Sequence, residues 1–384
     1  MNRRGTVPLS DAKVVLLTNF IAPPRLPMLE AVADRVGALR VWVSTVMEAN
    51  RAWDPEWGNL QVEVQRSVAF EHHSRHPHGY VERQIVHLPY DTLFRLRRER
   101  PDFVLSSELG VRTLQAALYC AVSSTPLVIW VGLSESSEKG RGAARQLLRR
   151  ALLPRADAVL INGRSGARYV RQLGARADRV VTVPLTSGLG EVAIAEASAP
   201  REAHCLLYVG QLIERKGIVP FVAALGRWGR RHPAEQVTLQ LIGDGPEAAS
   251  LARLRLPGNV TVRSNGHLPY GRIAQAYAQA SLFVLPTLAD EWGLVVNEAM
   301  AAGLPVLGSV YSQAVEELVK DGVNGWVFQP DDPEAVDTVL DRTLRVGAPE
   351  LARMGAAARE AVRSLTPEFA ADRLVEGLRI AAGR

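Results

Sequence analysis

Short apolar runs that alternate with helical patterns extend along this whole 384-residue chain and constrain its fold more than any other feature. Each run is four to six residues long and continuously apolar, as in parallel strands that are covered on both faces. The runs lie at residues 13–18, 39–44, 103–106, 127–131, 158–162, 205–209, 237–242, 260–263, 282–285, 305–308 and 325–328. Helical patterns separate many of them, at residues 27–36, 110–122, 142–153, 218–231, 270–279 and 293–302. Two successive βαβ series predict an α/β protein with two doubly wound, Rossmann-like domains.

Two interruptions of this rhythm suggest the domain boundaries. Residues 186–203 are rich in small side chains and predict a linker between an N-terminal domain at 1–185 and a C-terminal domain at 204–366. A second break at Thr366 and Pro367 precedes a final helical pattern, which we expect to cross back to the first domain as residues 367–384. Between residues 51 and 83 the pattern is poorest, and we expect a long inserted loop on the acceptor side.

Composition limits the class of protein. Apolar residues make up 47% and charged residues 22% of the chain, an ordinary globular mixture. No apolar run approaches the roughly 18 residues that a membrane span requires. With two cysteines and no apolar signal segment near the start, we expect a reduced, cytoplasmic protein.

The charge is distributed unevenly along the chain. Lys and Arg exceed Asp and Glu by 26 to 17 in residues 1–185 but fall short by 19 to 23 in residues 186–384. The first half therefore predicts an anionic partner, such as a membrane surface or a lipid-linked acceptor, rather than a nucleic acid. The leucines and arginines of residues 141–155 allow two interpretations: a helix that lies on an anionic bilayer, or a helix whose leucines pack on the first domain.

Glycines mark one turn at which a ligand could approach the backbone. Gly243 and Gly245 follow an apolar run in a Gly-x-Gly-x-x-Ala pattern. A dinucleotide fingerprint would also need an acidic residue about 20 positions later. None occurs between Glu247 and Asp290, so a nicotinamide cofactor is disfavoured. No stretch fits the phosphate loop Gly-x4-Gly-Lys-Ser/Thr either. The remaining interpretation of Gly243 and Gly245 is a tight strand-to-helix turn near a ligand.

Two charged segments follow predicted strands of the second half. Asp290 and Glu298 flank a helix start near Gly293, where free amides could bind an anion; alternatively, the acids only complement the helix dipole. Arg215 and Lys216 lie in the loop after the first strand of that half, where open α/β sheets bind ligands. The alternative is two solvated loop cations.

Taken together, these segments resemble the retaining nucleotide-sugar glycosyltransferases of family 4, which have the GT-B fold. The resemblance covers residues 207–336 and includes 208–212 (YVGQL), 215–217 (RKG), 242–246 (IGDGP), 265–267 (NGH), Asp290, 298–306 (EAMAAGLPV) and 321–326 (DGVNGW). The first half resembles the group more loosely, through residues 17–24, 100–104 and 156–159. The resemblance implies two domains facing each other across a cleft, with the donor on the second and the acceptor on the first.

The resemblance also implies the roles of individual residues. It places the family's two donor-contacting acids, which have seven residues between them, at Asp290 and Glu298, and its phosphate-binding lysine at Lys216. Other implied donor contacts are Gln211, Arg215, Gly243, His267, Trp292, Gly293, Leu294 and Val295. The implied reaction moves a sugar from a nucleoside diphosphate, most simply UDP, to a hydroxyl with retention of configuration and without a metal. The products would be a polysaccharide, a glycolipid or a glycosylated natural product.

Several positions depart from the family pattern. Gln211 stands where the family usually has an arginine, and Arg215 is a candidate substitute. The family's mid-domain histidine is absent, so its role is either vacant or taken by Ser134 or Glu135. Glu135 is our fourth catalytic candidate beside Lys216, Asp290 and Glu298.

The expected acceptor-binding residues are Asn19, Arg25 and Glu108. The departures keep a non-catalytic sugar-nucleotide-binding protein open as an alternative, as well as another enzyme of this architecture, such as a sugar-nucleotide epimerase.

Overall fold

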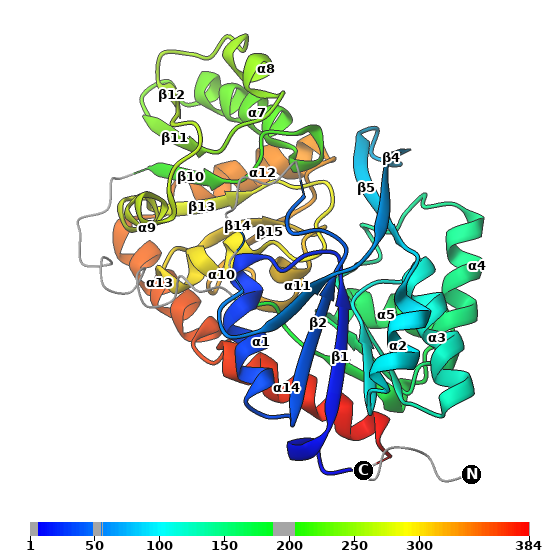
Figure 1. The fold of residues 1–384 in the computed structure, drawn as a ribbon. Coiled ribbons are helices and arrows are strands. Elements are labelled where there is room, and N and C mark those ends of the chain that lie inside the picture. Colours follow the sequence, from blue (N-terminus) through cyan, green and yellow to red (C-terminus); the bar gives the residue numbers. More distant parts are fainter. Residues whose placement is uncertain (1–6, 49–54, 56, 187–203, 384) are drawn as a thin grey trace. The chain divides into compact units, whose positions relative to one another are not determined.

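A computed structural model describes residues 7–48, 55, 57–186 and 204–383. The chain divides into two compact units, and each is described by itself. Unit 1 takes its described residues from Met1–His76, Glu82–Thr186 and Leu365–Arg384, and unit 2 from Pro77–Val81 and Ser187–Ser364 (Figure 1). Residues 187–203 of the expected linker lie outside the described residues.

Unit 1 is built on a seven-stranded parallel sheet in the order β3-β2-β1-β6-β7-β8-β9. Its strands are β1 (Lys13–Thr18), β2 (Ala38–Val43), β3 (Gln61–Val64), β6 (Phe103–Ser106), β7 (Leu127–Val131), β8 (Ala158–Ile161) and β9 (Val180–Thr182). Helices cover both faces: α1 (Leu26–Ala33), α2 (Thr92–Glu99), α3 (Val111–Ser123), α4 (Ala143–Leu152), α5 (Arg164–Gln172) and α14 (Pro367–Ala381). Along β1, Val14 and Leu16 pack towards α1 and α14, while Val15 and Leu17 pack towards α2, α3 and α5. Because both faces of β1 are buried, its sequence is a continuous apolar run.

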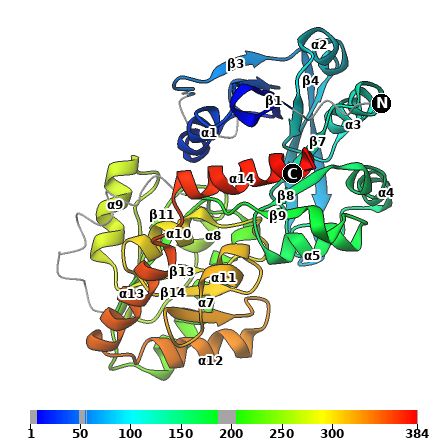
Figure 2. The same cartoon turned by 90° about the horizontal axis from the view of Figure 1, so that it is seen from below.

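The last helix, α14, belongs to unit 1 although it follows all of unit 2 in sequence. The Thr366 side chain accepts a hydrogen bond from the Phe369 amide and so caps the helix at the predicted break. Figure 2 shows α14 beside β8 and β9, which it contacts. Gly377 allows this approach, because a Cβ there would lie 2.3 Å from Cδ2 of Leu160 on β8.

The expectation of an inserted loop at residues 51–83 was wrong for most of that segment. It contains β3, β4 (Ser67–Arg75) and the start of β5 (Val81–Pro89); β4 and β5 form a separate two-stranded sheet. Most side chains of β4 are exposed, so no continuous apolar run marks the strand. Residues 51–54 and 56 lie outside the described part of the chain.

The arginine-rich segment at 141–155 forms α4 and mostly follows the packing interpretation. Leu152 and Leu153 are buried in the unit 1 core, and Leu148 packs against it. Arg149 is buried and forms an ion pair with Glu138, and Arg141 pairs with Glu82. Leu147 departs from the expected stripe and is 71% exposed.

Unit 2 has a six-stranded parallel sheet in the order β12-β11-β10-β13-β14-β15. The strands are β10 (Cys205–Val209), β11 (Val237–Ile242), β12 (Val260–Ser264), β13 (Leu282–Leu285), β14 (Val306–Ser309) and β15 (Gly325–Phe328). The helices are α7 (Ile218–Arg231), α8 (Ala248–Ala252), α9 (Tyr270–Gln279), α10 (Leu294–Ala301), α11 (Gln313–Leu318), α12 (Pro333–Thr343) and α13 (Ala348–Val362). One face of the sheet packs against α7 and α12, and α13 contacts α10.

Candidate active site

The topological switch point of unit 2 lies between β10 and β13. The chain leaves β10 for β11 on one side of the sheet, whereas β13 pairs with β10 on the other side. Connections therefore diverge at the carboxyl ends of these two strands, which is where open α/β sheets bind ligands. The loop after β10 carries Gln211, Arg215 and Lys216, and the loop after β13 carries Asp290. These four predicted donor residues therefore come from the two loops that meet at the switch point.

Glycine makes the close approach of these loops possible. Gly217 adopts a left-handed conformation (φ 64°), and a Cβ there would lie 2.2 Å from the carbonyl oxygen of Pro286. Gly243 after β11 is similarly constrained, because a Cβ would lie 1.9 Å from the Gly210 carbonyl oxygen. Any larger residue would push the loops apart. The glycines thus fix the position of Lys216 relative to the β13 loop.

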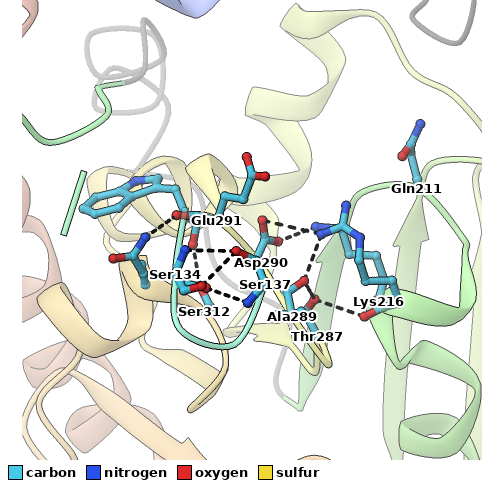
Figure 3. Close-up of polar contacts among 12 residues, drawn as sticks. Ser134, Ser137, Gln211, Lys216, Thr287, Ala289, Asp290, Glu291 and Ser312 are labelled. Carbon is cyan, nitrogen blue, oxygen red and sulfur yellow. Dashed lines mark hydrogen bonds and ion pairs between the residues drawn. The ribbon is translucent and has the colours of Figure 1, made fainter. Parts of the chain in front are cut away.

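Asp290 is the most heavily partnered acid of this site. Its carboxylate pairs with the Lys216 ammonium and lies 3.9 Å from the Arg215 guanidinium (Figure 3). Arg215 also donates a 2.8 Å hydrogen bond to the Ala289 carbonyl. Burial alone would raise the pKa of Asp290, but the two cations and the Trp292 amide hold that pKa below its usual value. Asp290 is therefore a carboxylate at neutral pH, and both Arg215 and Lys216 are directed at it.

Glu298 occupies a different environment. It lies on α10, is buried, and accepts a 3.0 Å hydrogen bond from the Tyr277 hydroxyl on α9. Burial raises the pKa of Glu298 to about 7, and the Tyr277 hydrogen bond opposes that rise. Asp290 and Glu298 therefore differ in charge near neutrality, since of the two only Asp290 has cations beside it. Tyr277 carried no signal in the sequence, because a single tyrosine in an amphipathic helix looks like a core residue.

The start of α10 is held in place by loop contacts. Trp292 is buried, and its indole N–H donates a 2.8 Å hydrogen bond to Asn297 on the helix. Its carbonyl accepts a 2.6 Å hydrogen bond from the Ser312 hydroxyl. Gly293 follows with φ 103°, and Leu294 and Val295 form the first turn. Because the Trp292 amide already bonds Asp290, the amides of Gly293, Leu294 and Val295 are the stronger anion-binding candidates.

The other donor candidates lie on neighbouring loops of the same sheet edge. Gln211 is exposed, and its side chain stands apart from the Lys216–Asp290 pair (Figure 3). His267 is exposed after β12. The amide of Gly243 donates a 2.8 Å hydrogen bond to Gly266, which joins the loops after β11 and β12.

Unit 1 has its own switch point, between β1 and β6. Asn19 follows β1 and Glu108 follows β6, and a residue that the sequence did not reveal, Arg112, joins them. The Arg112 side chain is fully buried, donates to Thr18 O and the Asn19 side chain, and lies 3.2 Å from Glu108. The spacing of four residues between Glu108 and Arg112 was the available signal. Arg25, from the loop after β1, lies over the Trp130 ring at 4.9 Å.

Ser134 and Glu135 follow β7. The hydroxyls of Ser134 and Ser137 each accept a hydrogen bond from the other residue's amide, so Ser134 is a buried turn residue (Figure 3). The Glu135 carboxylate bonds Arg168 at 2.8 Å and Gln172 at 3.3 Å on α5. The structure thus brings Asn19 and Glu108 together, but ties Glu135 to α5.

Among the described residues, no three His, Cys, Asp or Glu side chains are grouped as metal ligands. At the unit 2 switch point two cations, Lys216 and Arg215, lie beside the Asp290 carboxylate.

Comparison with known proteins shows that this region is similar to a described family. Residues 203–345 match the family model described as Glycosyl transferases group 1. The chain is 30% identical over 188 residues to D-inositol 3-phosphate glycosyltransferase of Streptomyces griseus, which is 46% of this chain and 39% of that protein. It is 34% identical over 155 residues to sulfoquinovosyl transferase SQD2 of Arabidopsis thaliana, covering 37% of this chain and 29% of the relative. The chain thus spans well under half the length of these curated relatives.

Solved structures extend the similarity to the whole fold. The HepE protein of Anabaena in complex with UDP superposes with a TM-score of 0.70 at 19% identity, over 96% of this chain and 99% of that one. Sucrose-phosphate synthase of Thermosynechococcus elongatus gives 0.68 at 18% identity, over 96% and 98%. The fold is therefore that of the GT-B class, with two Rossmann-like units in one chain. Within it, the segment similar to Glycosyl transferases group 1 lies in unit 2.

Proposed function

We propose that this chain is a retaining glycosyltransferase of family 4, which transfers a sugar from a UDP-linked donor to a hydroxyl acceptor. The observation that carries this proposal is the meeting of Lys216, Arg215 and Asp290 at the unit 2 switch point, inside the segment that matches the group 1 model. A nucleoside diphosphate needs cations for its phosphates and carboxylates for its hydroxyls. This cluster supplies both.

The ion pair between Lys216 and Asp290 suggests how the donor would be received. On binding, the diphosphate replaces Asp290 as the partner of Lys216, and Asp290 accepts hydrogen bonds from sugar hydroxyls. Arg215 supplies the second cation that Gln211 cannot provide. As the bond to the sugar breaks, negative charge accumulates on the diphosphate, and fixed cations stabilise that state more than the ground state.

Glu298 would bind the ribose. A carboxylate can accept hydrogen bonds from both ribose hydroxyls, and Tyr277 holds the carboxyl group in one orientation. We propose UDP as the nucleotide because the HepE protein, which has the same fold, was crystallised in complex with UDP. Since Lys216, Arg215 and the α10 amides could together meet the phosphates, we propose that departure of the diphosphate needs no metal.

Unit 1 would bind the acceptor through Asn19, Arg25 and Glu108. Arg112 contacts Asn19 and Glu108 and would hold both side chains in place. An acceptor hydroxyl on a polysaccharide, a glycolipid or a natural product fits these polar side chains. Because Glu135 pairs with Arg168 and Gln172, we favour a positioning role for it over a direct catalytic one.

Calorimetric titration with UDP, UDP-sugars and GDP-mannose, followed by a nucleotide-release assay, tests the proposal. We expect UDP and one UDP-sugar to bind, and slow UDP release from that sugar nucleotide without an acceptor. A chain that binds no nucleotide contradicts the proposal. A chain that binds a sugar nucleotide but neither hydrolyses nor transfers it is instead a non-catalytic binding protein.

A further inference from the structure

Helix α3 of unit 1 has an outward face made only of apolar side chains. Val111, Leu114, Leu118, Ala121 and Val122 are all exposed, and they recur at spacings of three and four residues along one side of the helix. We call these five residues the α3 face. Leu118 is 55% exposed and Val122 is 79% exposed. An amphipathic surface helix normally turns such a stripe inward, but α3 already buries Ala116, Tyr119 and Cys120 on its other side.

The two neighbouring helices extend this surface with both apolar and basic residues. Helix α2 packs against α3 and exposes Phe94 (71%), with Arg97 and Arg98 three and four residues further on the same side. Helix α4 contacts α3 and exposes Leu147, with the exposed Arg150 three residues further along the helix. Figures 1 and 2 both show α2, α3 and α4 on one side of unit 1. The apolar stripe is therefore flanked by arginines on both sides.

Carboxylates do not offset these arginines. The six acids between residues 90 and 155 all contact basic groups or amides of the unit: Asp91, Glu99, Asp102, Glu108, Glu135 and Glu138. By contrast, Arg97, Arg98 and Arg150 are exposed and form no ion pair within the described part of the chain. The outward side of the three helices is consequently apolar and positively charged.

We propose that the α3 face is a membrane-contact surface, which rests on an anionic lipid bilayer. Leu114, Leu118 and Val122 enter the boundary between headgroups and acyl chains, and the flanking arginines meet the anionic headgroups. None of the described helices is long and apolar enough to cross a membrane. The inference does not depend on glycosyl transfer.

Charge distinguishes a bilayer from a second copy of the chain. A two-fold dimer through the α3 face would set this arginine-flanked patch against its own copy, and like charges would then face each other. An anionic surface instead neutralises the arginines on both sides. Binding to it should weaken as salt is added, since exposed charges are screened.

Vesicle flotation with the full chain tests the proposal. One set of vesicles is pure phosphatidylcholine, and the other contains about 30% phosphatidylglycerol to provide a negative surface. We expect binding to the anionic vesicles only. Leu118→Gln/Val122→Gln should lower the partition coefficient about tenfold, because two apolar anchors are lost. Arg97→Gln/Arg98→Gln should lower it by a similar factor and reduce its salt dependence.

The matched control is Val323→Gln in unit 2, which removes one valine that is 45% exposed. It should bind like the unchanged protein. Gln is a good helix former, so circular dichroism should show that the α3 variant remains folded. Equal binding to both vesicle types, no binding by the unchanged protein, or full binding by the α3 variant would each overturn the proposal. Loss of a dimer in the α3 variant during sedimentation, without any vesicle binding, would assign the face to self-association instead.

Discussion

Lys216 and Asp290 lie 74 residues apart in the sequence, yet they form an ion pair where the loops after β10 and β13 meet. Asp290 is buried, so the carboxylate of this pair has little contact with water. If a bound donor replaced this ion pair, Lys216 would contact the diphosphate and Asp290 would contact sugar hydroxyls, so both charges would keep a partner. That exchange makes Lys216 the most informative residue to change.

Lys216→Ala should lower kcat by roughly 10²–10³, the range seen when one preorganised electrostatic group is lost. The KM for the donor should change less, because Arg215, Glu298 and the α10 amides still bind the ground state. Steady-state kinetics of Lys216→Ala and Arg215→Ala would rank the two cations. Gln211→Arg in the Lys216→Ala background should restore part of the rate, since a guanidinium can bind two phosphate oxygens at once. If neither alanine variant loses activity, this loop does not hold the diphosphate.

Glu298→Gln should weaken UDP binding at about pH 8 by on the order of 1–3 kcal/mol, because the amide loses the charge-assisted part of its hydrogen bonds to ribose. Calorimetry with UDP measures this directly. The matched control is Glu291→Gln, which changes an exposed acid seven positions earlier. An unchanged dissociation constant for Glu298→Gln would remove Glu298 from the donor site.

Stability should depend on the ionisation of Glu298. Its pKa is about 7 in the folded chain, against 4.5 for an unperturbed Glu, so the folded state retains a proton that the unfolded state releases. Stability is therefore lost as the pH rises through this window. Relative to the unchanged protein, Glu298→Gln should gain on the order of 1–3 kcal/mol between about pH 5 and pH 8. Urea unfolding over that range provides the measurement. The hydrogen bond from Tyr277 lowers the pKa of Glu298 in the folded chain, so Tyr277→Phe should raise that pKa and move the upper end of the window to higher pH. A stability difference between Glu298→Gln and the unchanged protein that does not vary with pH would contradict the assignment.

Chelation should leave glycosyl transfer intact. Lys216, Arg215 and the α10 amides offer positive charge to the diphosphate without an ion. Rates with EDTA and with added magnesium should agree within about twofold, a difference worth less than 0.5 kcal/mol. Activity that disappears with EDTA and returns with magnesium would show that the phosphates need a metal.

Arg112→Ala should destabilise the fold by roughly 3–5 kcal/mol, because it leaves Glu108 and the Thr18 carbonyl without their buried partner. Arg168→Ala, which removes the exposed partner of Glu135, is the control and should cost less than about 1 kcal/mol. Denaturant unfolding of both variants compares the costs. Similar losses would mean that Arg112 is not an anchor for the β1 and β6 loops.

The sequence predicted the parallel strands well, because strands buried on both faces must be continuously apolar. The strand at 13–18 and the strand at 282–285 have the predicted bounds. It did not reveal β3, β4 or β5, whose exposed residues carry no such pattern. Strands with few buried residues are defined by their pairing partners rather than by their own composition.

The candidate site was predictable only for residues that a short motif brings together. The spacing of Asp290 and Glu298 could be read directly, but the partners of these acids could not. Tyr277 reaches Glu298 from another helix, and Arg112 reaches Asn19 across 93 residues of sequence. Such contacts depend on how the elements pack, which local patterns do not encode.

Helix α14 has a consequence for the order in which the chain can fold during synthesis. Ala370, Leu374 and Leu378 complete the same core as Val14 and Leu16. A ribosome makes these three residues after every strand of both sheets, so that face of the unit 1 sheet stays partly uncovered until α14 has been made. The last helices of unit 2, α12 and α13, also follow all of these strands but precede α14, so the core of unit 2 can be completed first. The half of the protein that is made first is thus the half that is finished last.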